Sequence, residues 1–221
     1  MTSPHDHTVR ITKGNLALEG ILGLPAIPRG VVLFAHGSGS GRFSPRNNFV
    51  ARHLQQNGLA TLLLDLLTPD EADDRRKVFD IDQLADRLLL AKAWLEQEPR
   101  TANMGIGYFG ASTGAGAALQ AAARDPSSIR AAVSRGGRPD LAEPYLASVK
   151  APTLLIVGGD DQPVIEMNQA AYELLTCEKK LVIIPGATHL FEEPGTLELV
   201  ANRACSWFQL YVQRDGGTAE R

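Results

Sequence analysis

A sharp junction between a strand and a helix in the middle of the chain limits the possible folds more than any other feature. Residues 104–110 (MGIGYFG) have the pattern of an apolar strand, and an alanine-rich helix pattern follows through Arg124. The sequence GASTG at 110–114 joins them. A turn this short strains the backbone of its central residue, and only small neighbours fit between strand and helix. The junction therefore predicts that the Ser112 side chain stands free at the end of a buried strand.

The same stretch has two other interpretations. Its glycines at 105, 107 and 110 match the Gly-x-Gly-x-x-Gly pattern of dinucleotide-binding proteins. In that motif the glycines open the helix, whereas here Ile106, Tyr108 and Phe109 fill the gaps as strand residues would. The acidic residue expected about 20 positions later on a second strand is missing, because Asp125 falls at the predicted helix end, beside Pro126. A tight turn with a merely exposed serine is the plainer alternative, and only the other loops of the chain can decide against it.

Length and composition fit one globular domain. The 221 residues suffice for a single domain over 1–221, with mobile polar tails expected at 1–7 and 215–221. A net charge of −3 gives no reason to expect nucleic acid or a membrane as partner. No apolar run reaches about 18 residues, and residues 1–7 lack the features of a signal peptide, so a cytoplasmic location is expected. Cys177 and Cys205 lack metal-binding spacing, and we expect neither a metal nor a cofactor.

Strand and helix patterns alternate along the chain. Short apolar runs predict strands buried on both faces, and apolar residues at three- and four-residue spacing predict helices. After a hairpin within 8–22, we expect strands at 31–35, 59–64, 104–110, 129–133, 153–157 and 181–184; helices from Asn47 or Asn48 to 57, from 80 to 95, 113 to 124, 163 to 175 and, capped by Thr196, to 211; and an exposed loop at 68–80. The alternation predicts a single α/β domain with a mostly parallel sheet, helices on both faces and an N-terminal β-hairpin.

Polar residues follow several of these strands at their carboxyl ends, where ligands bind in open α/β sheets. Ser38, Ser112, Arg135, Asp161 and His189 should converge there. A serine hydroxyl needs a base to take its proton, and that base needs a carboxylate to orient it. Ser112, Asp161 and His189 supply these three groups, each on a loop after a predicted strand. The alternative for His189 is an ordinary surface histidine.

The neighbouring residues leave further alternatives. Asp160 competes with Asp161, which we prefer because it directly precedes a helix, where the loop can turn its side chain inward. His36 is expected to shape the glycine-rich loop that follows it rather than to act as a base. The backbone N–H groups of Thr113 and Ser38 would form an oxyanion hole, since the first opens a helix and the second lies among glycines. A plain flexible turn is the alternative for that loop.

Four motifs together resemble the α/β-hydrolase superfamily, and within it the dienelactone hydrolase-like branch. They are His36-Gly37-Ser38-Gly39, Gly110-Ala111-Ser112-Thr113-Gly114, Gly158-Gly159-Asp160-Asp161 and Gly186-Ala187-Thr188-His189. The resemblance extends from about residue 9 to 211 and includes the order serine, acid, histidine. It implies hydrolysis of a small soluble carboxylic ester or lactone through an acyl-enzyme. Dienelactone hydrolases proper carry a cysteine nucleophile, so Ser112 indicates a serine esterase rather than an enzyme for dienelactone itself.

The lengths of the loops bear on the substrate. Residues 134–151, between the sixth strand and the acid-bearing strand, are too few for the helical lid of lipases. We therefore expect an open site without a substantial lid, suited to small acyl substrates. The rival to the enzyme is a non-catalytic relative that binds a small molecule or a partner in the same pocket. The sequence does not indicate the oligomeric state.

Three arginines are expected near this opening. Arg46 follows the glycine-rich loop, and Arg135 and Arg138 follow the sixth strand. Guanidinium groups match the oxygens of carboxylate and phosphate, so these side chains are candidates to bind an anionic substrate. The alternative is that they pair with acidic side chains and only fix the loops. The acidic candidates are Asp65, Asp140 and Glu143.

Overall fold

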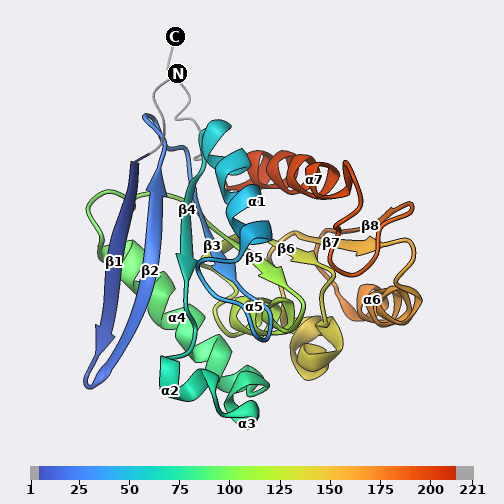
Figure 1. Ribbon diagram of the computed structural model, residues 1–221, viewed down its shortest axis with the longest axis horizontal. Helices are drawn as coiled ribbons and strands as arrows, with labels where there is room; N and C mark the ends of the chain where they lie inside the picture. Colours follow the sequence, from blue (N-terminus) through green and yellow to red (C-terminus); the bar gives the residue numbers. More distant parts are fainter. Residues whose placement is uncertain (1–4, 213–221) are drawn as a thin grey trace.

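The computed structural model describes residues 5–212. Within them, eight strands form one sheet in the order β1-β2-β4-β3-β5-β6-β7-β8, with helices on both faces (Figure 1). The strands are β1 (His5–Lys13), β2 (Leu16–Leu24), β3 (Val31–Ala35), β4 (Ala60–Leu64), β5 (Ile106–Ala111), β6 (Ile129–Arg135), β7 (Thr153–Gly158) and β8 (Lys179–Ile184). The β1–β2 and β2–β4 pairs are antiparallel and the others parallel. This confirms the predicted α/β fold with its N-terminal hairpin.

The helices form two layers. They are α1 (Pro45–Gln56), α2 (Pro69–Ala72), α3 (Arg75–Val78), α4 (Ile81–Gln97), α5 (Thr113–Arg124), the 3₁₀ segment η1 (Pro139–Ser148), α6 (Gln162–Leu174) and α7 (Thr196–Tyr211). On the side of α1 and α7, Phe34 and Phe109 stack with ring centroids 4.9 Å apart. On the side of α4 and α5, Leu33 and Tyr108 are buried. Because the central strands are covered on both faces, their sequences read as continuous apolar runs.

Two helix starts differ from the prediction. Helix α1 begins at Pro45 rather than after Asn47 or Asn48, because the Ser44 hydroxyl caps it by accepting the N–H of Asn47. Helix α7 is capped by Gly195, in the left-handed conformation with φ of 81°. Thr196 is therefore the first residue inside the helix rather than its cap, and its hydroxyl donates to the carbonyl of Glu193.

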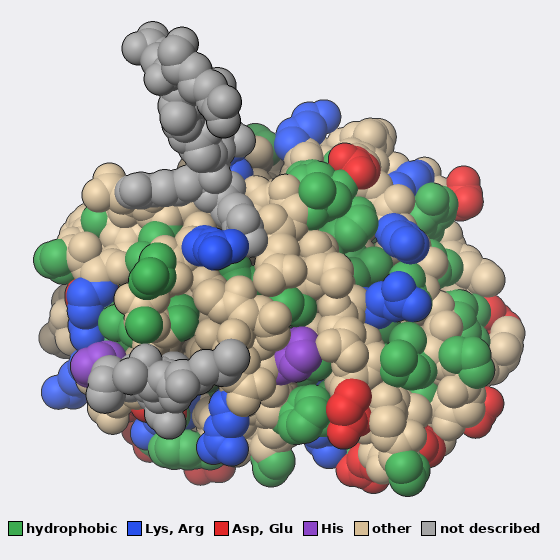
Figure 2. Space-filling view, turned by 90° about the horizontal axis from the view of Figure 1, so that it is seen from above, with side chains coloured by type: hydrophobic (Ala, Val, Ile, Leu, Met, Phe, Trp, Pro, Cys, Tyr) green, Lys and Arg blue, Asp and Glu red, His purple; other side chains and the backbone are tan. Residues whose placement is uncertain are grey.

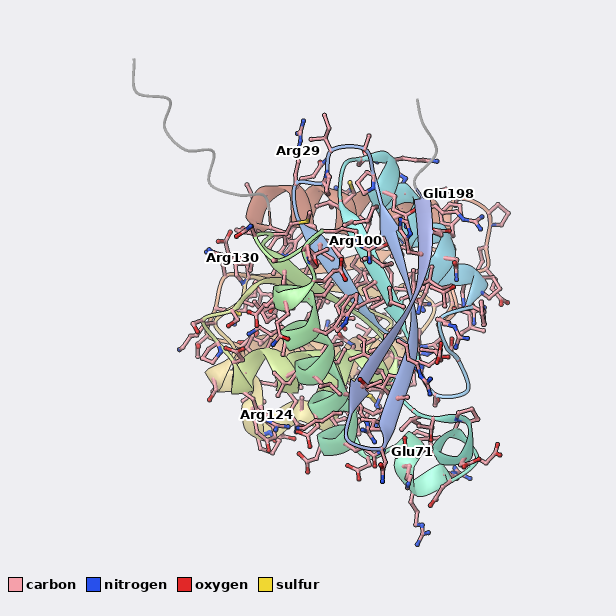
Figure 3. All side chains as sticks on the ribbon, turned by 90° about the vertical axis from the view of Figure 1, so that its left-hand side faces the viewer. Arg29, Glu71, Arg100, Arg124, Arg130 and Glu198 are labelled. Atoms are coloured by element: carbon pink, nitrogen blue, oxygen red, sulfur yellow. The ribbon has the colours of Figure 1, made fainter. Side chains whose placement is uncertain are left out.

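The segment 68–80, predicted as an exposed loop, is largely exposed, but the loop assignment is wrong because α2 and α3 occupy it. Thr68 and Glu71 form a capping box, in which each side chain accepts the other residue's backbone N–H. The Glu71 carboxylate, labelled in Figure 3, also accepts hydrogen bonds from Gln83 and Arg87 of α4. These bonds fix α2 against α4, and Lys77 of α3 pairs with the same carboxylate at 3.5 Å.

The N-terminal end of the described chain is more ordered than the sequence predicts. Residues 5–7, predicted as part of a mobile tail, instead belong to β1, where His5 is paired with Leu24 of β2; the predicted tail at 215–221 lies outside the described residues. No helix of the described chain has the length and apolar character to cross a membrane. On the described part of the face in Figure 2, basic side chains are interspersed with acidic, apolar and uncharged surface rather than gathered into one patch. The cytoplasmic location stays a prediction.

Candidate active site

Ser112 occupies the strained position that the junction predicts. It lies between the last residue of β5 and the first of α5, with φ of 50° and ψ of −123°. A positive φ is unusual for a residue with a Cβ atom. The helix can turn this sharply because a Cβ atom on Gly114 would lie only 2.3 Å from the carbonyl oxygen of Ala35, so glycine is required there. Among residues 5–212 the Ser112 hydroxyl has no hydrogen-bond partner, which leaves it free at the carboxyl end of the sheet.

His189 and Asp161 are in direct contact. They lie on the loops that follow β8 and β7, with 2.7 Å between His189 Nδ1 and Asp161 Oδ2. A carboxylate can only accept, so we assign the proton to Nδ1, which leaves Nε2 unprotonated and able to accept a proton. Asp161 is largely buried and His189 about one-third exposed, with side-chain exposures of 14% and 37%. Asp160 is exposed, and it is Asp161 that contacts His189, as the sequence favoured.

The Arg135–Gly136 segment links the serine to the histidine. The Ser112 N–H donates to the Arg135 carbonyl at 3.2 Å. A Cβ atom on Gly136 would lie 3.5 Å from Cε1 of the His189 ring, so the imidazole packs directly against that glycine. Ser112 and His189 therefore both adjoin the end of β6. No hydrogen bond joins their side chains within the part of the chain that the structure describes.

The glycine-rich loop after β3 lies against the nucleophile. A Cβ atom on Gly37 would lie 3.0 Å from the Ser112 Cβ, so only glycine permits this approach without displacement. The Ser38 N–H donates to the Thr113 hydroxyl at 3.0 Å. The Thr113 N–H belongs to the first turn of α5, where backbone donors have no partner within the helix. Both predicted oxyanion residues thus adjoin Ser112, although the Ser38 amide is already engaged.

His36 holds this loop in place. Its Nε2 accepts the N–H of Leu66 at 3.0 Å, and its Nδ1 lies 3.0 Å from the Gly37 carbonyl, to which it donates. Burial lowers the pKa of the imidazole, opposed by the Gly37 hydrogen bond and the charge of Asp65. A neutral ring suits one donated and one accepted hydrogen bond. The loop is therefore fixed rather than a flexible turn, and the structural role expected for His36 is confirmed.

A cavity of about 640 Å³ opens beside this loop and reaches Thr113. The loop and the start of α1 form one side. The α2–α3 segment and the start of α4 form the other, which is mostly apolar; its side chains include Leu67, Pro69, Ala72, Val78 and Leu84. The polar composition of 68–80 gave no sign of this wall, although the Thr68–Glu71 capping box indicates a helix there. The described residues hold no cluster of His, Cys, Asp and Glu suited to a metal ion.

The three arginines differ in their partners. Arg138 pairs with Asp140, with 2.7 Å between Nη2 and Oδ2. This residue therefore follows the alternative interpretation, in which the arginine pairs with an acidic side chain and fixes the loop. Arg46 lines the cavity and pairs with Glu192 at 3.0 Å, a partner that the sequence did not suggest. Arg135 is 7% exposed, and its side chain forms no ion pair or hydrogen bond with residues 5–212.

A mostly parallel sheet of this order with a strained serine after β5 defines the α/β-hydrolase class. A family model described as PET hydrolase-like (PETase) matches residues 52–219. A dienelactone hydrolase from Anabaena variabilis is 56% identical, with a TM-score of 0.93 over 96% of this chain and 100% of that protein. The chain therefore belongs to the PET hydrolase-like family of α/β-hydrolases, and within that class it is dienelactone hydrolase-like.

Other relatives are similar to this chain only in part of their length or only in fold, which limits the inference of their activities for this protein. Two curated proteins of Mycobacterium tuberculosis, whose names propose a phosphoribosyl transferase, are 58% identical over 203 residues. These residues are 92% of this chain but 46% of each relative, so the chain spans about half their length. A dienelactone hydrolase-like promiscuous phosphotriesterase from metagenomic libraries has a TM-score of 0.77 over 95% of this chain and all of that protein. At 18% identity, that likeness shows the fold alone.

Proposed function

We propose that the protein is a serine hydrolase that cleaves small soluble carboxylic esters or lactones through an acyl-enzyme. The observation that carries this proposal is the pairing of His189 with Asp161 at the end of the sheet where the strained Ser112 stands. Family membership supports the general chemistry, and the serine supports an esterase or lactonase activity. A nucleophile, its base and an orienting carboxylate on three separate loops are the parts that acyl transfer needs.

In the proposed reaction, Ser112 Oγ attacks the carbonyl carbon while His189 Nε2 takes the hydroxyl proton. Asp161 stabilises the resulting imidazolium through its hydrogen bond at Nδ1. The tetrahedral intermediate then expels the alcohol, which takes the proton from Nε2. Water attacks the acyl-enzyme with the same base, releasing the acid and restoring Ser112. A lactone follows the same course, with acid and alcohol remaining in one product.

The negative oxygen of the intermediate would be bound by the N–H groups of Thr113 and Ser38. Thr113 opens α5, so its amide lies at the positive end of a helix. The Ser38 N–H bonds the Thr113 hydroxyl in the resting structure. The Ser38 N–H would bind the oxyanion in one of two ways. Its hydrogen would be shared between the oxyanion and the Thr113 hydroxyl, or that hydroxyl would first rotate away. The nearness of Gly37 to Ser112 supports this role for the loop.

The cavity supports a small substrate. Its volume of about 640 Å³ lies within the usual range for small-molecule sites, about 300–1,000 Å³. The mostly apolar α2–α3 wall would hold the carbon skeleton. The connection from β6 to β7 forms only the short η1 segment, so it supplies no large helical lid over the site.

Two other activities are less well supported. A non-catalytic binding protein would need the cavity but not a serine, a base and a carboxylate together. The name proposing a phosphoribosyl transferase belongs to relatives about half of whose length has no counterpart in this chain. No feature of residues 5–212 favours that activity over hydrolysis.

Hydrolysis of 4-nitrophenyl acetate by the purified protein tests the proposal. We expect steady turnover that Ser112→Ala and His189→Ala abolish while thermal unfolding stays near that of the unaltered protein. Ser206→Ala, which removes an exposed hydroxyl on α7, is the matched control and should keep full turnover. Turnover that survives Ser112→Ala would show that another group carries the reaction.

A further inference from the structure

Arg135 is a buried cation without a counter-ion in the part of the chain that the structure describes. It ends β6, only 7% of its surface is exposed, and its Nε is buried with no hydrogen-bond partner from residues 5–212. No carboxylate of residues 5–212 lies within ion-pair distance of its guanidinium. Burying an unpaired charge is costly, and proteins normally provide a partner for it. Within residues 5–212 this cation therefore lacks the anion that its burial calls for.

A second arginine adds to this excess of positive charge. Burial is the main reason why the pKa of Arg135 falls to about 10, and the positive charge of Arg46 is the second. Among residues 5–212, the Nε of Arg46 is also buried without a partner, and the one acidic contact of its guanidinium is with Glu192, whose side chain is 64% exposed. The other neighbour of Arg135 is the Phe191 ring, with its centroid 5.9 Å from the guanidinium carbon. Of these two guanidinium groups, only that of Arg46 has an acidic partner within residues 5–212, and that partner is exposed.

This pair adjoins the reacting groups. The Arg135 carbonyl accepts the Ser112 N–H, and the next residue, Gly136, packs against the His189 ring. Arg46 lines the cavity that also reaches Ser38 and Thr113. The Phe191 ring beside the Arg135 guanidinium comes two residues after His189 and also packs against Gly136. An anion bound to this guanidinium would therefore lie on the side of the site that the His189 loop forms.

We propose that Arg135 and Arg46 form a subsite for an anionic group, carboxylate or phosphate, carried by the substrate. The proposal rests on the proposed ester hydrolysis and narrows it to anionic esters or lactones. Guanidinium groups suit both kinds of anion because their N–H donors match pairs of oxygens. Arg138 is not part of the subsite, because Asp140 already occupies its guanidinium. The same loop thus contains a matched control.

The test compares three 4-nitrophenyl esters of similar size: the neutral pentanoate, the hemisuccinate with a carboxylate, and the 3-phosphonopropanoate with a phosphonate. The measured quantity is the ratio of kcat/KM for each anionic ester to that for the neutral one. We expect a ratio above one at constant ionic strength. Arg135→Met and Arg46→Gln should lower it about tenfold to a hundredfold, the usual loss for hydrogen bonds to charged groups. Arg138→Met should keep it.

The outcomes separate the two proposals. Equal kcat/KM values for neutral and anionic esters, all dependent on Ser112, would overturn the subsite and leave the hydrolase. If only one anionic ester is preferred, the subsite stands and its anion is identified as carboxylate or phosphate. If no ester is cleaved, the proposed hydrolysis fails, and binding decides the subsite. Succinate or inorganic phosphate should then raise the Tm of the unaltered protein more than sodium chloride of equal ionic strength, and Arg46→Gln should abolish the difference. No such rise would overturn the subsite.

Discussion

Arg135→Met should make the unliganded protein more stable, although it removes a large buried side chain. At pH 7 the guanidinium is charged in both the folded and the unfolded chain. Burial lowers its pKa on folding from its much higher usual value to about 10, so the fold disfavours that charge by about 3 kcal/mol. Methionine keeps most of the apolar stem without the charge. Loss of the contact with the Phe191 ring offsets about 0.5–2 kcal/mol, which leaves a net gain of about 1–2 kcal/mol.

Urea unfolding at pH 7 in a buffer without phosphate or carboxylates measures this difference. The gain should hold below pH 10 and shrink as the pH rises above about 10, because the folded protein releases the Arg135 proton at a lower pH than the unfolded chain does. Arg138→Met is the control: its partly exposed pair with Asp140 should cost at most about 1 kcal/mol. A loss of stability in Arg135→Met as large as that in Arg138→Met would refute the reasoning, because it would mean that the buried charge is already compensated.

Three further changes test other parts of the account. Asp161→Asn should lower kcat for 4-nitrophenyl acetate by about 10⁴, while Asp160→Asn should have little effect; the reverse ranking would move the acid to Asp160. Gly37→Ala should lower kcat/KM by about 10², because its methyl group meets the Ser112 Cβ at 3.0 Å and displaces the loop; unchanged kinetics would separate that loop from catalysis. Burial alone would raise the pKa of Glu71, but the Thr68 N–H and the charges of Arg87 and Lys77 outweigh it, so the pKa is lowered overall. The ionised Glu71 carboxylate therefore stabilises the fold at neutral pH, and this contribution should disappear as the pH falls below about 4. The Tm of Glu71→Gln should lack that part of the acid dependence, and parallel Tm curves would contradict it.

Short acyl chains should be cleaved faster than long ones. The cavity of about 640 Å³ is bounded by α2 and α3, and the β6–β7 connection supplies no large lid that could open at an oil surface. Initial rates with acetyl, butyryl and dodecanoyl 4-nitrophenyl esters measure the preference. Faster hydrolysis of the dodecanoyl ester, or activation above its solubility limit, would contradict the open, small-substrate site.

The sequence predicts the central sheet and the elbow well because both depend on local rules. Continuous apolar runs indicate strands covered on both faces, and the GASTG turn has few backbone solutions. The choice of Asp161 over Asp160 also follows from a local feature, the helix that begins at Gln162. The capping box of Thr68 and Glu71 was equally visible, but the polar composition of 68–80 suggested a loop instead.

The state of the arginines depends on packing between distant segments and could not be predicted. Strand β6 continues to Arg135 because that residue is in register with Ile156 of β7 and Ala111 of β5, beyond the apolar run that ends at Val133. Arg46 meets Glu192 across 146 positions of sequence. The three guanidinium groups therefore differ although their charges are equal. Arg138 is paired, Arg46 is paired only with an exposed carboxylate, and Arg135 has no partner among residues 5–212. Only Arg138 has its partner, Asp140, nearby in the sequence, whereas the states of Arg46 and Arg135 depend on distant segments.

Covalent labelling of Ser112 tests the central claim most directly. The folded protein would be treated with a fluorophosphonate, which reacts with activated serines, then digested and measured by peptide mass spectrometry. We expect one adduct per chain, on the peptide that contains Ser112, and a large fall in labelling rate in His189→Ala. An intact, folded protein that takes up no label on Ser112, or that labels equally fast without His189, would contradict the proposed serine hydrolase.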